Sequence, residues 1–224
     1  MSAHRLVPDP ASFVESATDA GAQAGIAQLC TAAEQVLRQW AEPSRAYHNT
    51  EHLAEVLDHL KELHLATRDR AGPVAVLAAW FHDAVYTATP GADERASAEL
   101  AVTLLTAADT PAPVIHEVRR AVLATIDHQP NVAPQDHRWG EQAALLDADL
   151  AILAAAPSRY ARYLLGVREE YRHIPDAAFA AGRTQVVSAL LGRERLYLTE
   201  TGHRRWEAVA RRNLAAELPG GFAG

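Results

Sequence analysis

Apolar residues recur three or four positions apart along most of the chain, which is the spacing of one face of an α-helix. Residues that favour helix are abundant, and stretches that alternate apolar and polar residues like a strand are hard to find. The pattern therefore predicts an all-α, single-domain helical bundle. The candidate helices run roughly over 24–41, 49–67, 73–87, 92–108, 112–127, 139–155, 158–172, 176–192 and 203–217.

The length of the chain fits this organisation. It has 224 residues, enough for one domain with a full hydrophobic core, and it contains no repeat or linker that would divide it. We expect a single domain over 1–224, with its core at about 24–217. Residues 1–12 and 218–224 are expected to form flexible tails.

Composition bears on partners and location. The formal net charge is -7, and an acidic chain lacks the basic surface that a nucleic-acid polymer needs. A small anionic substrate is compatible with this charge, because a bound metal supplies local positive charge. Cys30 is the single cysteine, which excludes an internal disulfide and a cysteine-based zinc cluster. With no membrane-spanning apolar run, we expect a cytoplasmic protein without a membrane partner, and the oligomeric state is left open.

A histidine interrupts the most apolar stripe of the sequence. Ala78, Phe81 and Val85 follow the spacing of a buried helix face, and His82 lies on the same stripe with Asp83 beside it. A buried carboxylate is costly unless it is paired or bound to a metal. An isolated pair of this kind is more often a core histidine beside an ion-paired aspartate, so its meaning depends on other residues.

Asp149 is a second polar residue on an apolar stripe. It lies four positions after Leu145 and three before Ile152, whereas Asp147 points more to the side. Periodicity therefore selects Asp149 as the inward carboxylate. An aspartate paired with a buried arginine is the alternative interpretation.

Two histidines stand near the start of the helix predicted at 49–67. His48 and His52 are four positions apart, so they share a face if this stretch is already helical. If Asn49 or Thr50 caps the helix, His48 lies just outside it and His52 lies in its first turn. Two surface histidines near a helix start would explain the pattern about equally well.

His128 stands at the end of the helix predicted at 112–127. A helix C-terminus stabilises a protonated histidine, so a simple cap is slightly favoured over a metal ligand here. Two histidines and two carboxylates are sufficient for one transition metal with water in the open positions. Such a set suits Mn, Fe, Co, Ni or Zn better than Mg, which prefers oxygen.

The order of these groups resembles the HD-domain superfamily of metal-dependent phosphohydrolases. It is most similar to a bacterial subfamily of predicted phosphohydrolases, and the resemblance spans about residues 40–217. The stretches that carry it are Tyr-His-Asn-Thr-Glu-His at 47–52, Ala-Trp-Phe-His-Asp-Ala-Val-Tyr at 79–86 and Leu-Asp-Ala-Asp-Leu at 146–150.

The resemblance implies roles for five residues. His52, His82, Asp83 and Asp149 would be the ligands of a divalent transition metal. His48 would stand where related phosphodiesterases place the histidine that protonates the leaving oxygen, and Asp83 would also act on the attacking water. An exchange of roles between His48 and His52 stays open.

The resemblance also implies a reaction. Members with two metals usually have two further histidines, and only His128 is well placed here, as a second-metal or phosphate contact. We therefore expect one metal per chain and hydrolysis of a small phosphate mono- or diester, with a nucleotide among the candidates. The alternatives are a di-iron oxygenase, against which the few histidines count, and a non-catalytic protein that retains the pocket for ligand binding.

Four further residues are candidates for contact with an anionic substrate. Arg168, Tyr171 and Arg183 are proposed because arginine grips phosphate through two hydrogen bonds. A structural ion-pair network of Arg168 and Arg183 with Glu170 is an equally good interpretation. Glu94 is a rival acid, base or substrate contact, although an exposed charge in the first turn of a helix is favoured.

Overall fold

The computed structural model describes residues 7–67 and 72–218, and over these residues every regular element is a helix. The prediction of an all-α fold is confirmed. The elements are α1 (Pro10–Asp19), α2 (Ile26–Trp40), α3 (Thr50–Thr67), α4 (Pro73–Phe81), α5 (Ala92–Ala107), α6 (Ala112–Ala124), α7 (Trp139–Leu150), the 3-10 helix η1 (Ala151–Ala154), α8 (Pro157–Glu170), α9 (Asp176–Leu191) and α10 (Glu200–Glu217).

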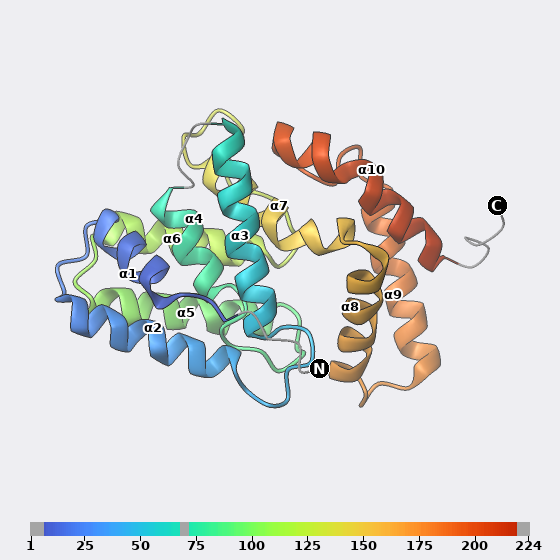
Figure 1. The fold of residues 1–224 in the computed structure, drawn as a ribbon, viewed down its shortest axis with the longest axis horizontal. Helices are drawn as coiled ribbons and strands as arrows, with labels where there is room; N and C mark the ends of the chain where they lie inside the picture. The colour runs from blue at the N-terminus through green and yellow to red at the C-terminus, as the bar shows by residue number, and fades with distance from the viewer. Residues whose placement is uncertain (1–6, 68–71, 219–224) are drawn as a thin grey trace.

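The helices surround a central group made of α3, α4 and α7. Helices α1, α2, α5 and α6 lie on one side of this group, and α8, α9 and α10 lie on the other (Figure 1). Helix α4 contacts α1, α3, α5, α6 and α7. Seven of its nine residues are buried, so the chain that follows α4 starts deep inside the protein.

The predicted helices do not include α1, and the tail predicted at 1–12 overlaps its first turn. The side chain of Asp9 caps this helix, and a proline occupies an initial position. Phe13 packs edge-on against Trp80 and Phe81, which anchors α1 on the core. Helix α1 is short and only two of its residues are buried, so its apolar stripe is too brief to predict a helix from the sequence. Positions 1–6 and 219–224 lie outside the described residues.

The helix predicted at 73–87 is wrong at its C-terminal end, because α4 stops at Phe81. Arg45, whose side chain is buried, donates hydrogen bonds to the backbone carbonyls of Asp83 at 2.6 Å and Ala84 at 2.8 Å. Carbonyl groups past a helix end need such partners. The guanidinium group thus stabilises a turn where the sequence pattern predicts further helix.

Other predicted ends differ by a few residues. Helix α6 stops at Ala124 and not near 127, and the helix predicted at 139–155 changes to 3-10 geometry after Leu150. Helix α10 begins at Glu200, three residues before the predicted start, because the side chain of Thr199 accepts a hydrogen bond from the first turn.

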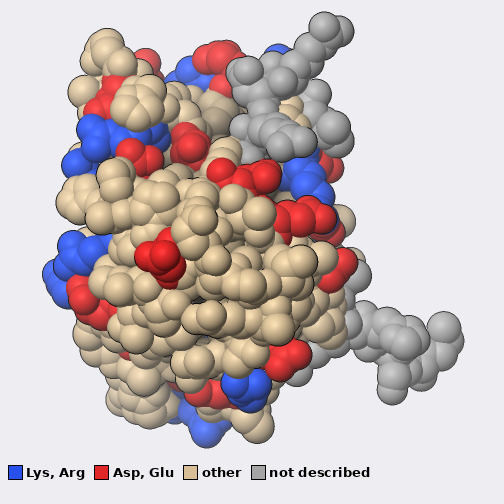
Figure 2. Space-filling model, turned by 90° about the vertical axis from the view of Figure 1, so that its left-hand side faces the viewer, with Lys and Arg blue, Asp and Glu red and all other residues tan. Residues whose placement is uncertain are grey.

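One face of the molecule has a centre with few charges. Figure 2 shows the side that lies on the left in Figure 1, where mostly uncharged residues cover the centre around an isolated acidic spot, and both signs of charge mix around the margin. Across this face the described residues form no continuous basic surface of the kind that binds a phosphate backbone. Among the described helices, none combines the length and the apolar character needed to cross a membrane.

Candidate metal centre

The four predicted metal ligands converge between α3, α4 and α7. The Nε2 atom of His52 lies 3.3 Å from Nε2 of His82 and 3.2 Å from Oδ1 of Asp149. The Nε2 atom of His82 lies 3.4 Å from Oδ2 of Asp83 and 3.6 Å from Oδ1 of Asp149. A metal that holds its donors at about 2.1 Å keeps neighbouring donors roughly 3.0–3.4 Å apart. His52, His82 and Asp83 each offer a donor atom within 4.8 Å of the other two, so these three side chains could hold one cation, and Asp149 lies beside both histidines.

Both histidines are oriented through their other ring nitrogen. The Nδ1 atom of His82 lies 2.7 Å from the carbonyl oxygen of Ala79, which can only accept, so Nδ1 carries a proton. The Nδ1 atom of His52 lies 3.1 Å from the hydroxyl of Tyr47. Both imidazoles are buried. Each Nε2 atom is thereby directed at the cluster, as a metal ligand requires.

The carboxylates favour a positive charge in this cluster. Burial alone would lower the pKa of His82, but the charges of Asp83 and Asp149 raise it to about 9. Burial alone would raise the pKa of Asp149, but hydrogen bonds from His128, His52 and His82 hold it well below its ordinary value. Burial lowers the pKa of His52. A divalent cation would compete with a proton for this place.

The start of α3 separates the two histidines of the 47–52 stretch. Helix α3 begins at Thr50, and Oδ1 of Asn49 accepts a hydrogen bond from the N–H of Glu51 at 2.9 Å. This confirms that a cap at this point leaves His48 outside the helix and His52 in its first turn. The Nε2 atom of His48 lies 3.9 Å from Oδ2 of Asp83, at the edge of the cluster.

Glu170, at the end of α8, fixes the position of His48. Its Oε1 atom accepts hydrogen bonds from the backbone N–H groups of Tyr47 at 2.8 Å and His48 at 2.9 Å. Its Oε2 atom lies 2.7 Å from Nδ1 of His48 and accepts a hydrogen bond from the hydroxyl of Tyr86 at 3.1 Å. The ring of His48 also stacks on Tyr86, with 4.3 Å between centroids. His48 is therefore held from two sides.

The pKa values of this pair move in opposite directions. Burial alone would raise the pKa of Glu170, but the hydrogen bond and charge of His48, with two backbone N–H groups, lower it to about 2. Burial alone would lower the pKa of His48, but the hydrogen bond to Glu170 and the charge of Asp83 raise it. The carboxylate thus holds the Nδ1 proton and leaves the Nε2 proton of the charged ring available for transfer.

The role of Glu170 was not predicted, although the spacing of apolar residues in α8 indicates that this side chain faces the interior. Glu170 continues the stripe of Tyr163 and Val167 at helical spacing, so it faces the interior. Gly166 permits the close approach of α8 to the loop, because a Cβ atom there would lie 2.9 Å from Cβ of Tyr47. The carboxylate can therefore reach backbone groups that lie more than a hundred residues away in sequence.

The alternative interpretation, one ion-pair network of Arg168, Glu170 and Arg183, is wrong, because each residue has a separate partner. Arg168 pairs with Asp176 at 2.6 Å and closes the turn between α8 and α9. Arg183 donates two hydrogen bonds to the carboxylate of Glu217, at 2.7 and 2.8 Å. Glu170 binds His48.

His128 lies beside the cluster and outside the group of four. Its Nε2 atom lies 3.0 Å from Oδ2 of Asp149, the oxygen that does not face His52. Its backbone has a φ of 51°, so the chain has left the helix before this point. His128 therefore contacts the candidate centre through Asp149 and is not merely a helix cap.

Asp147 is more deeply buried than predicted, with 1% of the residue exposed. It does not point to the side. Its carboxylate accepts hydrogen bonds from the N–H groups of Leu198 at 2.7 Å and Thr199 at 2.8 Å, and from the hydroxyl of Thr199 at 2.7 Å. Burial raises its pKa to about 6 despite these bonds. Asp147 thus anchors the chain before α10, while Asp149 faces the histidines.

A cleft of about 770 Å³ opens beside the cluster. His48, Asp83, His128 and Asp149 line it at the end nearest the candidate centre, and Tyr86 extends the wall on which His48 stacks. A ligand in this cleft would reach the carboxylates and the held imidazole together.

Three of the four predicted substrate contacts line this cleft: Glu94, Tyr171 and Arg183. Glu94 also accepts a hydrogen bond from the N–H of Gly91 at 2.6 Å, which closes the first turn of α5. This contact agrees with the interpretation of Glu94 as a charge in the first turn of a helix. Arg168 is not among the residues that line the cleft. Its guanidinium serves the turn between two helices, so its assignment as a substrate contact is not supported.

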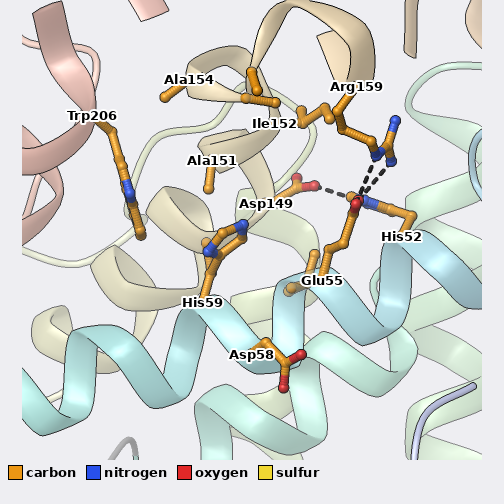
Figure 3. A pocket seen from close by; sticks show the side chains of 14 residues that line it. His52, Glu55, Asp58, His59, Asp149, Ala151, Ile152, Ala154, Arg159 and Trp206 are labelled. Atoms are coloured by element: carbon orange, nitrogen blue, oxygen red, sulfur yellow. Dashed lines mark hydrogen bonds and ion pairs between the residues drawn. The ribbon is translucent and has the colours of Figure 1, made fainter. Parts of the chain in front are cut away.

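A second, smaller pocket of about 310 Å³ also reaches the cluster. His52 and Asp149 line it, and Trp206 of α10 stands across from them (Figure 3). At its edge Arg159 donates two hydrogen bonds to the carboxylate of Glu55, both at 2.6 Å. Asp149 lines both pockets, so it stands between this pocket and the larger cleft.

A comparison with protein-family models, curated proteins and solved structures finds no match. The family resemblance therefore stays a prediction, and the functional interpretation depends on the geometry of the site.

Proposed function

We propose that this chain is a metal-dependent phosphohydrolase of the HD-domain type, acting on a small phosphate mono- or diester. The observation that carries the proposal is the convergence of His52, His82, Asp83 and Asp149 beside a histidine held by a buried carboxylate. Two imidazoles and two carboxylates suit one divalent ion of Mn, Fe, Co, Ni or Zn. When bound, such an ion lowers the pKa of a water molecule and polarises a phosphoryl oxygen.

Residues of the chain would supply the proton transfers. His48 donates its Nε2 proton to the leaving oxygen, and Glu170 stabilises the charged ring and keeps it turned toward the cluster. Asp83 or Asp149 accepts the proton of the attacking water or orients that water. Substrate enters through the larger cleft, where all of these side chains except Glu170 are exposed to the ligand.

A panel of phosphate esters tests the proposal on protein loaded with Mn²⁺ or Co²⁺. We expect turnover, and we expect His48→Gln to lower kcat on alkyl esters by about 100-fold or more, as loss of a general acid does. The loss is smaller on nitrophenyl esters, whose leaving oxygen needs little protonation. His203→Gln, which alters a half-exposed histidine on α10, is the control and leaves kcat unchanged. If no mono- or diester is hydrolysed, the proposal is overturned.

The same preparation distinguishes the two alternatives. A di-iron oxygenase would bind two irons per chain and consume dioxygen, and His128 is the residue beside Asp149 that a second iron would use. A non-catalytic binding protein would bind metal and ester without turnover. One metal per chain together with ester hydrolysis supports the phosphohydrolase.

A further inference from the structure

The cleft beside the cluster is larger and more apolar than a phosphoryl group requires. Within its volume of about 770 Å³, Ile126 and Val186 keep 38% and 51% of their surface exposed. Phe179 lines the same cleft and is half-buried. Apolar surface left in water is unfavourable by about 25 cal/mol per Å². A ligand that covers these three side chains would gain this free energy.

Helix α9 forms a wall of small side chains along the cleft. Ala178, Gly182 and Ala189 line it at helical spacing. Along the whole helix only Val187 and Leu190 are buried, so this wall is accessible. Gly182 lies in the middle of the stripe, and a Cβ atom added there would meet nothing within 4 Å. The cleft is therefore open where α9 borders it.

The cationic side chains that line the cleft already have protein partners. Arg183 is bound to Glu217 through two hydrogen bonds. Arg193 donates to the backbone carbonyls of Asp127 at 2.8 Å and His128 at 3.3 Å. These two arginines are the only Arg or Lys residues among the described lining. Both guanidinium groups are thus already engaged in hydrogen bonds within the protein, which lowers their availability for paired hydrogen bonds to a second phosphate.

Away from Asp83 and Asp149, the two proposed metal ligands, the lining carries three carboxylates, Asp93, Glu94 and Asp127, against these two guanidinium groups. A polyanion such as a nucleoside triphosphate would therefore find no excess of positive charge along the rest of the cleft. One phosphoryl group next to a metal-bearing cluster needs none.

We infer that the substrate carries a single phosphoryl group on an apolar body, such as an alkyl or aryl chain that lies along α9. The hydrolytic step rests on the proposed function, whereas binding of the apolar body does not. In that step the ester P–O bond breaks and a water oxygen bonds to phosphorus. The alcohol oxygen takes the proton from His48, and the products are inorganic phosphate and an apolar alcohol.

A chain-length series tests this inference with the full chain loaded with Mn²⁺. Methyl, n-butyl and n-octyl phosphate have leaving groups of similar basicity, so their differences report on the apolar body. We expect kcat/KM to rise at least about tenfold from methyl to octyl, which corresponds to about 1.4 kcal/mol. Gly182→Phe fills the cleft and removes this gain, with methyl phosphate turnover little changed. Ala180→Phe places the same side chain on the exposed opposite face of α9. In this control kcat/KM should rise with chain length as it does in the parent protein.

Calorimetric binding of methyl and octyl phosphate to the His48→Gln variant separates the two proposals. Tighter binding of the octyl ester that Gly182→Phe abolishes supports the inference, even if no ester is hydrolysed and the proposed function fails. Equal binding of the two esters, or equal kcat/KM across a hydrolysed series, overturns the inference and leaves the hydrolase intact. Faster turnover of adenosine triphosphate than of octyl phosphate also overturns it.

Discussion

Replacing Glu170 by Gln removes the charge of the carboxylate that holds His48 and keeps its shape. The Oε1 acceptor of two backbone N–H groups survives, but an amide NH₂ group can replace the oxygen beside Nδ1 of His48. A pKa held at about 2, against an ordinary value of 4.5, corresponds to at most about 3.5 kcal/mol at about 1.4 kcal/mol per unit. Allowing for partial solvent screening, we expect Glu170→Gln to lower the free energy of unfolding by about 2 kcal/mol near neutral pH.

The sign of the pH dependence follows from the lowered pKa of Glu170. The stabilisation is fully present above the unfolded-state pKa of 4.5, and it is lost as the pH falls toward the folded-state value of about 2. The stability difference between the parent protein and Glu170→Gln should therefore shrink as the pH falls below 4.5. Urea unfolding followed by circular dichroism, at several pH values across this range, measures that difference.

Glu169→Gln is the matched control for this experiment. Its side chain is 58% exposed and pairs with Arg172, which lies in the turn just after α8. We expect this variant to change the free energy of unfolding by less than about 0.5 kcal/mol. A Glu170→Gln variant as stable as Glu169→Gln, or a deficit that does not change with pH, would refute the assigned role of Glu170.

Two further predictions concern residues that position the site. Asp147→Ala should destabilise the protein by about 2–3 kcal/mol in urea unfolding, since it leaves buried donors before α10 without an acceptor, yet it should retain metal. Asp149→Ala should lose metal instead, and the reverse pattern would show that the two carboxylates are misassigned. Gly166→Leu should lower the free energy of unfolding by about 1–3 kcal/mol and weaken the hold on His48, because its Cβ atom meets the loop before α3. Gly140→Ala is the control and should be neutral, because a Cβ atom there meets nothing within 4 Å. Thermal unfolding of the two glycine variants measures this contrast, and equal midpoints would contradict it.

Periodicity predicts those features that depend on one helix at a time. It places His82 and Asp149 on inward stripes, and both lie in the cluster. It fails for Asp147 because it assumes that a helix has one buried face, whereas α7 is buried on several sides. Six consecutive or nearly consecutive residues of α7 are buried, including Gln142 and Asp147, so a residue off the main stripe also faces the interior.

Long-range contacts account for the features that the sequence pattern does not predict. The end of α4 depends on Arg45, whose hydrogen-bond acceptors lie almost forty residues away. The hold of Glu170 on His48 depends on the approach of α8 to a loop far away in sequence. Neither contact follows from the spacing of apolar residues, because that spacing reports on a face and does not specify what the face meets.

Metal content tests most directly whether His52, His82, Asp83 and Asp149 form one cation site. The protein is loaded with Mn²⁺ or Zn²⁺, freed of unbound metal and analysed by mass spectrometry, with circular dichroism to confirm that each variant is folded. We predict about one metal per chain in the parent protein and in His128→Ala, and almost none in His82→Ala or Asp83→Ala. Full occupancy in both His82→Ala and Asp83→Ala, or no metal in the parent protein, would contradict the assignment.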